Sequence, residues 1–149
     1  MSRVRIKICG ITTPANGRAA AAAGADAIGL VFYPASSRAV DVATAAAIVR
    51  ELPPFVSAVG LFVDPEAAEV TEVLAGCPLD LLQFHGAESP AFCADFGRRY
   101  LKAVRVGAET DVAAAAAAYG EQRLLLDALV PGQAGGTGQT FQWQAIPPE

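Results

Sequence analysis

The chain lacks any apolar run near the length of about 20 residues that a membrane-spanning helix requires. Its first residues place arginines among strand-forming residues and include no apolar block of the kind found in secretory signals. Basic residues are also few, because 11 Lys and Arg stand against 15 Asp and Glu, for a formal net charge of -4. This composition argues against nucleic acid or an anionic membrane as a partner, and we expect a cytoplasmic protein.

Cysteine is scarce and scattered. Cys9, Cys77 and Cys93 have neither the close spacing of zinc ligands nor the density of a disulfide scaffold. We therefore expect reduced thiols and no metal site. Cys77 and Cys93 fall in predicted helical or helix-terminal positions, where packing is their expected role.

What the chain does have is a repeated alternation of strand-like and helix-like segments. With 149 residues, 53% of them hydrophobic, it can form one core, and we expect a single domain over residues 1–149. Apolar, β-branched runs begin 23, 30, 22, 21 and 23 residues apart and cover residues 4–9, 27–32, 57–63, 79–84, 100–106 and 123–127. Several are apolar at nearly every position, as parallel strands covered on both faces should be.

Residue types that begin and end helices lie between these runs. Expected starts, each with an N-cap side chain before a proline, are Thr13-Pro14, Asp64-Pro65 and Ser89-Pro90. Gly24, Gly76 and Gly120 stand where helices should end. The alanine runs at 19–23 and 113–118 favour helices that lie close to a sheet.

Six β/α units fit either an open doubly wound sheet or part of a (β/α)8 barrel. The turn after the first run does not match the G-x-G-x-x-G fingerprint of dinucleotide-binding sheets, which favours the barrel. In a barrel the ends of parallel strands meet at one rim. Cys9, which ends the first run, and Asp127, which ends the sixth, are therefore expected to lie at the same rim.

Six short segments carry a resemblance to a known family. They are Lys7-Ile8-Cys9-Gly10-Ile11-Thr12, Gly24-Ala25-Asp26-Ala27-Ile28-Gly29, Ser36-Ser37-Arg38-Ala39-Val40, Gln83-Phe84-His85-Gly86, Leu126-Asp127, and Gly135-Gly136-Thr137-Gly138 through Trp143. Together, in their order and spacing, they resemble phosphoribosylanthranilate isomerase over the whole chain. The resemblance implies a (β/α)8 barrel that converts N-(5'-phosphoribosyl)anthranilate to 1-(2-carboxyphenylamino)-1-deoxyribulose 5-phosphate in tryptophan biosynthesis, with no metal or organic cofactor.

The chain also departs from the family pattern. Ser37 stands where a proline is usual, and Gln142 where an aspartate is usual. The family continues after Trp143 into a seventh and an eighth β/α unit, and a barrel of this type needs at least about 200 residues. We therefore expect a partial barrel domain with about six of the eight units, inactive alone and able to self-associate through unpaired sheet edges.

The resemblance implies that Cys9 is the general base and Asp127 the general acid. The reaction, an Amadori rearrangement, needs an acid to protonate the furanose ring oxygen and a base to remove the proton of the adjacent sugar carbon. Positive charge or a helix N-terminus must favour the Cys9 thiolate, while burial and that thiolate favour protonated Asp127. Without the resemblance, a buried apolar role is favoured for Cys9, and Asp127 is equally well a loop-ordering carboxylate.

Substrate-binding residues are also expected from the motifs. The family pattern makes Arg38 the first choice for holding the anthranilate carboxylate, with a solvated loop arginine as the alternative. His85, the only histidine, either bonds the substrate or orients the loop at Gly86. Backbone N–H groups of a glycine-rich loop could bind the phosphate, or the loop could be a lid; its residues are Gly135, Gly136, Thr137 and Gly138.

Two other functions stay open from the sequence. One is a different phosphosugar enzyme on the same barrel. Against it, no strand end carries a metal cluster, and Lys102, the strand lysine considered for a Schiff base, lies within the fifth run and not at its end. The other is a non-catalytic fragment that binds a ligand or assembles with a missing C-terminal part.

Overall fold

The described part of the chain has an α/β fold in which six parallel strands form a half-barrel. The computed structural model describes residues 3–107, 109–128, 140, 144 and 146. The strands are β1 (Lys7–Cys9), β2 (Ala27–Val31), β3 (Ser57–Phe62), β4 (Leu81–Phe84), β5 (Arg99–Val106) and β6 (Leu124–Ala128). The helices are α1 (Pro14–Ala22), α2 (Val42–Arg50), α3 (Ala67–Gly76), α4 (Pro90–Ala94) and α5 (Val112–Tyr119), and a 3-10 turn, η1 (Glu121–Arg123), precedes β6.

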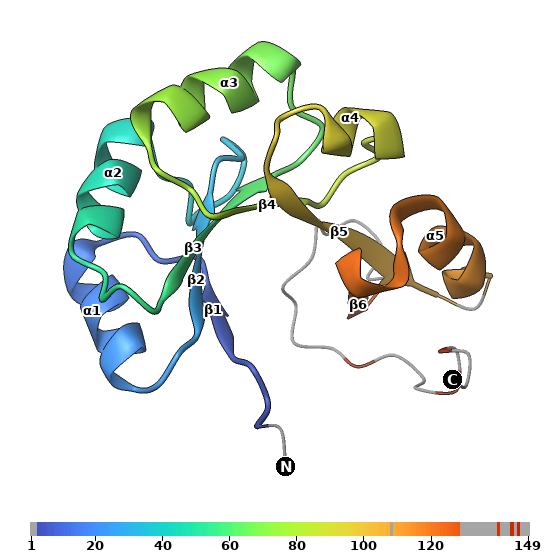
Figure 1. Cartoon of the computed structure of the whole chain (residues 1–149), viewed down its shortest axis with the longest axis horizontal. Helices are drawn as coiled ribbons and strands as arrows, with labels where there is room; N and C mark the ends of the chain where they lie inside the picture. The colour runs from blue at the N-terminus through green and yellow to red at the C-terminus, as the bar shows by residue number, and fades with distance from the viewer. Residues whose placement is uncertain (1–2, 108, 129–139, 141–143, 145, 147–149) are drawn as a thin grey trace.

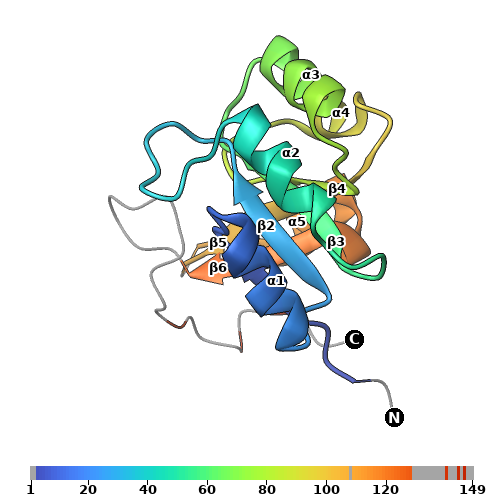
Figure 2. The same ribbon diagram turned by 90° about the vertical axis from the view of Figure 1, so that its left-hand side faces the viewer.

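Each strand pairs in parallel with the next strand along the chain, in the order β1-β2-β3-β4-β5-β6. The helices form an arc on the outside of this curved sheet (Figure 1), and the turned view in Figure 2 shows α1 and α2 in front of β2 and β3. The predicted set of six parallel strands with a helix in each interval is therefore confirmed. The first strand is shorter than expected, since only the last three residues of the run 4–9 are strand.

Two of the three predicted helix starts are confirmed. The Thr13 hydroxyl accepts a hydrogen bond from the Asn16 N–H, and Ser89 caps α4 in the same way through Phe92. The prediction at Asp64-Pro65 is wrong, because α3 begins at Ala67 behind a capping box made by Glu66 and Glu69.

Asp64 is used for a tertiary contact in place of a cap. Its backbone has a positive φ of 48°, and its carboxylate accepts a hydrogen bond from the Ala87 N–H in the loop after β4. A Cβ at Gly86 would lie 2.3 Å from the Asp64 Oδ1 atom, so this approach requires a glycine there. The contact joins the loops that follow β3 and β4.

The hydrophobic core lies between the sheet and the helices. Even-numbered strand residues form its sheet side, and Ile28, Leu30, Leu82 and Phe84 are fully buried there. The Phe84 ring packs edge-on against Phe92 of α4, with 5.7 Å between ring centroids. Because strand side chains alternate between faces, the odd-numbered residues point to the inside of the half-barrel.

Two strands, β1 and β6, pair on one side only within the described part of the chain. Ile8, on the outer face of β1, is 43% exposed, and Ile6, directly before the strand, is 46% exposed, where inner strands carry buried residues. Among the residues described, no helix is long and apolar enough to cross a membrane.

Candidate active site

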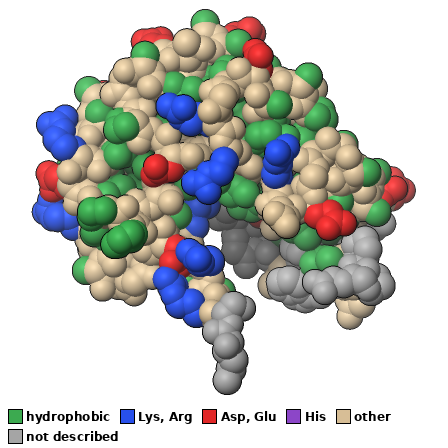
Figure 3. All heavy atoms as spheres, in the orientation of Figure 1, with side chains coloured by type: hydrophobic (Ala, Val, Ile, Leu, Met, Phe, Trp, Pro, Cys, Tyr) green, Lys and Arg blue, Asp and Glu red, His purple; other side chains and the backbone are tan. Residues whose placement is uncertain are grey.

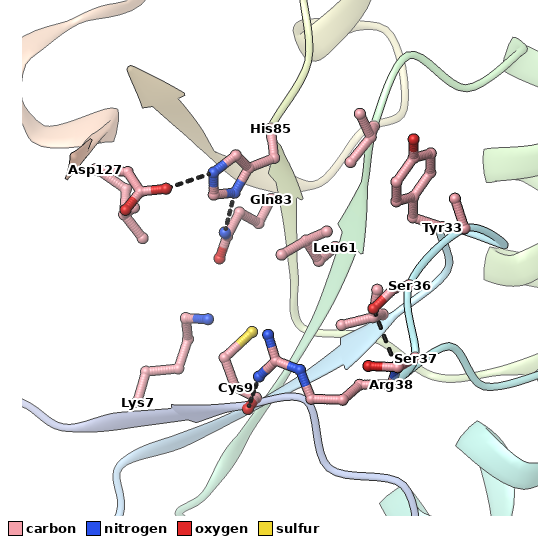
Figure 4. A pocket seen from close by; sticks show the side chains of 14 residues that line it. Lys7, Cys9, Tyr33, Ser36, Ser37, Arg38, Leu61, Gln83, His85 and Asp127 are labelled. Atoms are coloured by element: carbon pink, nitrogen blue, oxygen red, sulfur yellow. Dashed lines mark hydrogen bonds and ion pairs between the residues drawn. The ribbon is translucent and has the colours of Figure 1, made fainter. Parts of the chain in front are cut away.

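A cavity of about 710 Å³ lies at the carboxyl ends of the strands, and Figure 4 shows it from close by. Part of its wall is the loop after β2, which contributes Arg38. The rest comes from alternate residues of the strands or the residue that follows them: Lys7, Cys9, Val31, Leu61, Val63, Gln83, His85, Leu125 and Asp127. The structure thus brings Cys9, Arg38, His85 and Asp127, all predicted site residues, to one cavity.

Cys9 faces the cavity from the last position of β1, beside a cation. A Cβ at Gly29, its register partner on β2, would lie 2.7 Å from the Cys9 Sγ atom and 3.1 Å from the Lys7 Nζ atom. The glycine therefore provides the space in which the thiol and the Lys7 ammonium lie as close neighbours. Both side chains line the cavity.

Arg38 is fixed to the end of the same strand. Its Nη1 atom donates to the Cys9 carbonyl oxygen over 3.0 Å, and its backbone N–H donates to the Ser36 hydroxyl over 3.1 Å. Gly10 makes this possible, because its φ is +84° and a Cβ there would lie 2.5 Å from Arg38 Nη1. The guanidinium has five N–H donors, and among the described residues only Nη1 has a partner, so the other donors can face an anionic ligand.

His85 and Asp127 contact each other across the cavity. The His85 Nε2 atom lies 3.1 Å from the Asp127 Oδ2 atom, and its Nδ1 atom lies 3.1 Å from the Gln83 Nε2 atom (Figure 4). Burial lowers the pKa of His85, and the positive charges of Arg105 and Lys102 act in the same direction, while Asp127 opposes them. His85 is therefore neutral at pH 7, and its contact with Asp127 is a hydrogen bond.

Lys102 takes no part in the cavity wall. Its side chain is 5% exposed, and its ammonium donates to the Glu88 carboxylate over 3.2 Å and to the Gly86 carbonyl over 2.6 Å. The Glu88 carboxylate in turn accepts from the backbone N–H groups of Asp64 and Gly86. Lys102 is thus a structural cation that fixes the turn directly after His85.

The remaining predicted residues divide into two groups. Cys77 and Cys93 are fully buried, as expected from their packing role, and burial raises the pKa of each thiol to about 11. The glycine-rich loop, Gly135, Gly136, Thr137 and Gly138, lies outside the described residues. Within the part of the chain that is described, no three His, Cys, Asp or Glu side chains are grouped so that they could hold a metal ion.

The sequence interpretation missed Lys7 and Gln83 as cavity residues. Each lies two positions before a predicted residue, Cys9 and His85, and so on the same side of its strand. Alternation along the strands was the signal that could have identified them. On the surface seen in Figure 3, Lys and Arg side chains are interspersed with Asp and Glu, which agrees with the small net charge.

Comparisons with known proteins agree on one family. A family model for N-(5'phosphoribosyl)anthranilate (PRA) isomerase matches residues 6–149. The N-(5'-phosphoribosyl)anthranilate isomerase of Acidithiobacillus ferrooxidans is 57% identical over 148 residues, which are 99% of this chain and 72% of the relative.

Solved structures give the same answer. The crystal structure of phosphoribosyl anthranilate isomerase from Thermotoga maritima superposes with a TM-score of 0.86 at 40% identity, over 97% of this chain and 70% of that one. A second isomerase structure, in complex with reduced 1-(o-carboxyphenylamino)-1-deoxyribulose 5-phosphate, has a TM-score of 0.78 at 38% identity, over 85% and 66% of the two chains. With these matches and the cavity described above, the chain belongs to the phosphoribosylanthranilate isomerase family.

Proposed function

We propose that the chain isomerises N-(5'-phosphoribosyl)anthranilate to 1-(2-carboxyphenylamino)-1-deoxyribulose 5-phosphate, a step of tryptophan biosynthesis. The observation that carries this proposal is that Cys9 and Asp127, from the two outermost strands of the sheet, line one cavity in a member of this family. A base and an acid on different walls can act on two atoms of one bound sugar.

In this proposal Asp127 is the general acid and Cys9 the general base. Asp127 gives its proton to the furanose ring oxygen, the carbon–oxygen bond breaks, and the electron pair of the substrate nitrogen forms a carbon–nitrogen double bond. The Cys9 thiolate then takes the proton of the adjacent sugar carbon, and the electrons of that bond neutralise the iminium nitrogen. The resulting enol tautomerises to the ketone, so the aldose amine becomes a ketose amine with no external oxidant.

Two cations are available for the charged groups of the substrate. Arg38 is assigned to the anthranilate carboxylate, because its guanidinium is anchored on Cys9 with further donors still unused. Lys7 adds positive charge beside Cys9. The assignment of the phosphate to residues 135–138 stays a prediction from the sequence.

We also propose that the six described strands belong to the first six units of a (β/α)8 barrel and that residues 1–149 form a single domain. The 70% share of the Thermotoga maritima chain that is matched, at a TM-score of 0.86, supports this reading. Within the described residues β1 and β6 each pair on one side only, and Ile6 and Ile8 are exposed, so self-association of the chain is a further expectation. A cytoplasmic location stays a prediction.

The test combines turnover with binding. We would measure isomerase turnover by the chain alone and mixed with a polypeptide that carries the last two β/α units of a related isomerase. Calorimetry with the reduced product analogue would run alongside. The proposal predicts analogue binding and, in at least one of the two preparations, turnover near ordinary enzyme rates of about 1 s⁻¹. Binding without turnover in either preparation would leave a ligand-binding protein and overturn the enzymatic proposal.

A further inference from the structure

Gln83 is a buried polar residue of the cavity that the acid–base scheme above does not use. It is 2% exposed, and it lines the cavity from β4. Its Nε2 atom lies 3.1 Å from the His85 Nδ1 atom, and its Oε1 atom is buried with no hydrogen-bond partner among the described residues. A buried acceptor without a hydrogen-bond partner costs free energy.

The amide fixes where the His85 proton lies. An amide N–H next to Nδ1 requires Nδ1 to accept, so the single proton of neutral His85 is on Nε2 and points at the Asp127 carboxylate. In this arrangement the proton that lies between His85 and Asp127 is on Nε2. When the pair holds only this proton, Asp127 has none to give.

A second proton on the pair changes what the amide must offer. Whether the pair is then an imidazolium beside a carboxylate or a neutral His85 beside protonated Asp127, Nδ1 carries a hydrogen. That hydrogen needs an acceptor, and Gln83 supplies one if its amide turns over in place to present Oε1. The Gln83 Oε1 atom, which has no partner in the one-proton state, is thus the acceptor that the two-proton state needs.

We propose that Gln83 is a positioning residue, whose amide turns between donor and acceptor and so determines whether the His85–Asp127 pair carries one proton or two. The inference rests on the proposed function, since the two-proton state is the one in which Asp127 can act as the acid. The pair gives one proton to the sugar ring oxygen and keeps one, the amide returns to its donor orientation, and a proton from solvent restores the second.

Opposing effects act on the second proton of the His85–Asp127 pair, so one hydrogen bond can change whether it is bound. Burial of His85 and the positive charges of Lys102 and Arg105 on β5 oppose the second proton, while Asp127 on β6 favours it. Among the described residues, Gln83 on β4 is the remaining polar group that contacts the ring of His85, which follows that strand. An acceptor added or removed at this position should therefore move the protonation of His85.

The test uses the fact that His85 is the only histidine of the chain. Its ring nitrogens can be followed by 15N NMR across pH in wild type, Gln83→Glu and Gln83→Met, without any assignment step. Wild type should show the Nε2–H tautomer above its titration midpoint. The ionised carboxylate of Gln83→Glu only accepts, so the midpoint should rise by about one pH unit or more. Met offers neither a donor nor an acceptor, so the preference of neutral His85 for the Nε2–H tautomer should weaken.

The outcomes separate positioning from packing. A residue that merely fills space would give the same His85 midpoint and tautomer in wild type and folded Gln83→Met, and that result would overturn the proposal. If Gln83→Met does not fold, an unchanged midpoint in folded Gln83→Glu has the same consequence. Because the NMR measurement needs no substrate, its outcome is independent of the test of turnover. In active preparations, the pH at which kcat falls on the alkaline side should follow the same order among the variants as the His85 midpoint.

Discussion

The buried ion pair of Lys102 and Glu88 allows a quantitative prediction of stability. Their side chains are 5% and 2% exposed, with 3.2 Å between Nζ and Oε2. Lys102→Met removes the cation, keeps most of the apolar stem and leaves the Glu88 carboxylate buried without its charged partner. Removing one member of a buried pair costs about 3–5 kcal/mol. The loss would be a large part of a domain's usual stability of about 5–15 kcal/mol.

Urea unfolding of three variants would measure this effect. Lys102→Met with Glu88→Gln should be at least about 1 kcal/mol more stable than Lys102→Met alone, since an amide still accepts from the backbone and leaves no buried charge. The matched control is Arg18→Met, because Arg18 and Glu51 pair with side chains 55% and 44% exposed; we expect a loss of at most about 1 kcal/mol. Equal losses in Lys102→Met and Arg18→Met would refute the reasoning.

Three further predictions concern the site and its surroundings. Arg38→Ala should weaken binding of the carboxylate-bearing analogue by about 1.5–3 kcal/mol in calorimetry, with Arg38→Lys in between; unchanged affinity for the analogue and for its carboxamide would contradict the assignment. At pH 8 iodoacetamide should modify Cys9 alone in the folded chain, because burial holds the pKa of Cys77 and Cys93 at about 11; mass spectrometry that finds three modified thiols without denaturant would contradict this. Because the pKa of His85 is lowered in the folded chain, the unfolded chain takes up the His85 proton at a higher pH than the folded chain does. The free energy of unfolding, measured with urea, should therefore fall as pH drops below about 6.5, and His85→Gln should lose this pH-dependent part.

The strand pattern predicted from the sequence agrees closely with the structure. Each of the six apolar runs overlaps one strand, and the parallel order agrees with the helix-sized intervals between them. The run at residues 4–9 was predicted too long, because in the described part of the chain β1 pairs only with β2, through Lys7, Ile8 and Cys9. Hydrophobicity locates a strand better than it fixes where its pairing begins.

The site could be predicted only in part. Cys9 and Asp127 end apolar runs and can be found from that position, whereas Lys7 and Gln83 lie inside runs that were interpreted as covered on both faces. In the structure the inner face of the half-barrel accepts polar side chains at alternate positions, and Gln83 is buried there beside His85. A period of two, applied strand by strand, would have placed both residues in the cavity.

The helix start at Asp64-Pro65 failed for a tertiary reason. Local capping rules favour Asp64, yet its carboxylate binds the Ala87 N–H and its backbone N–H donates to Glu88 over 2.8 Å. These partners are more than twenty residues away in the sequence, so no local pattern contains them. The helix then starts at the next available cap, Glu66 with Glu69.

The central claim is that Cys9 and Asp127 are the base and the acid of one reaction, and kcat of two variants tests it most directly. In a preparation that turns over substrate, Cys9→Ala and Asp127→Asn should each lower kcat by about 10²- to 10⁴-fold while binding the reduced analogue within about tenfold of wild type. Either variant that binds the analogue and keeps more than about a tenth of the wild-type kcat would contradict the role assigned to that residue.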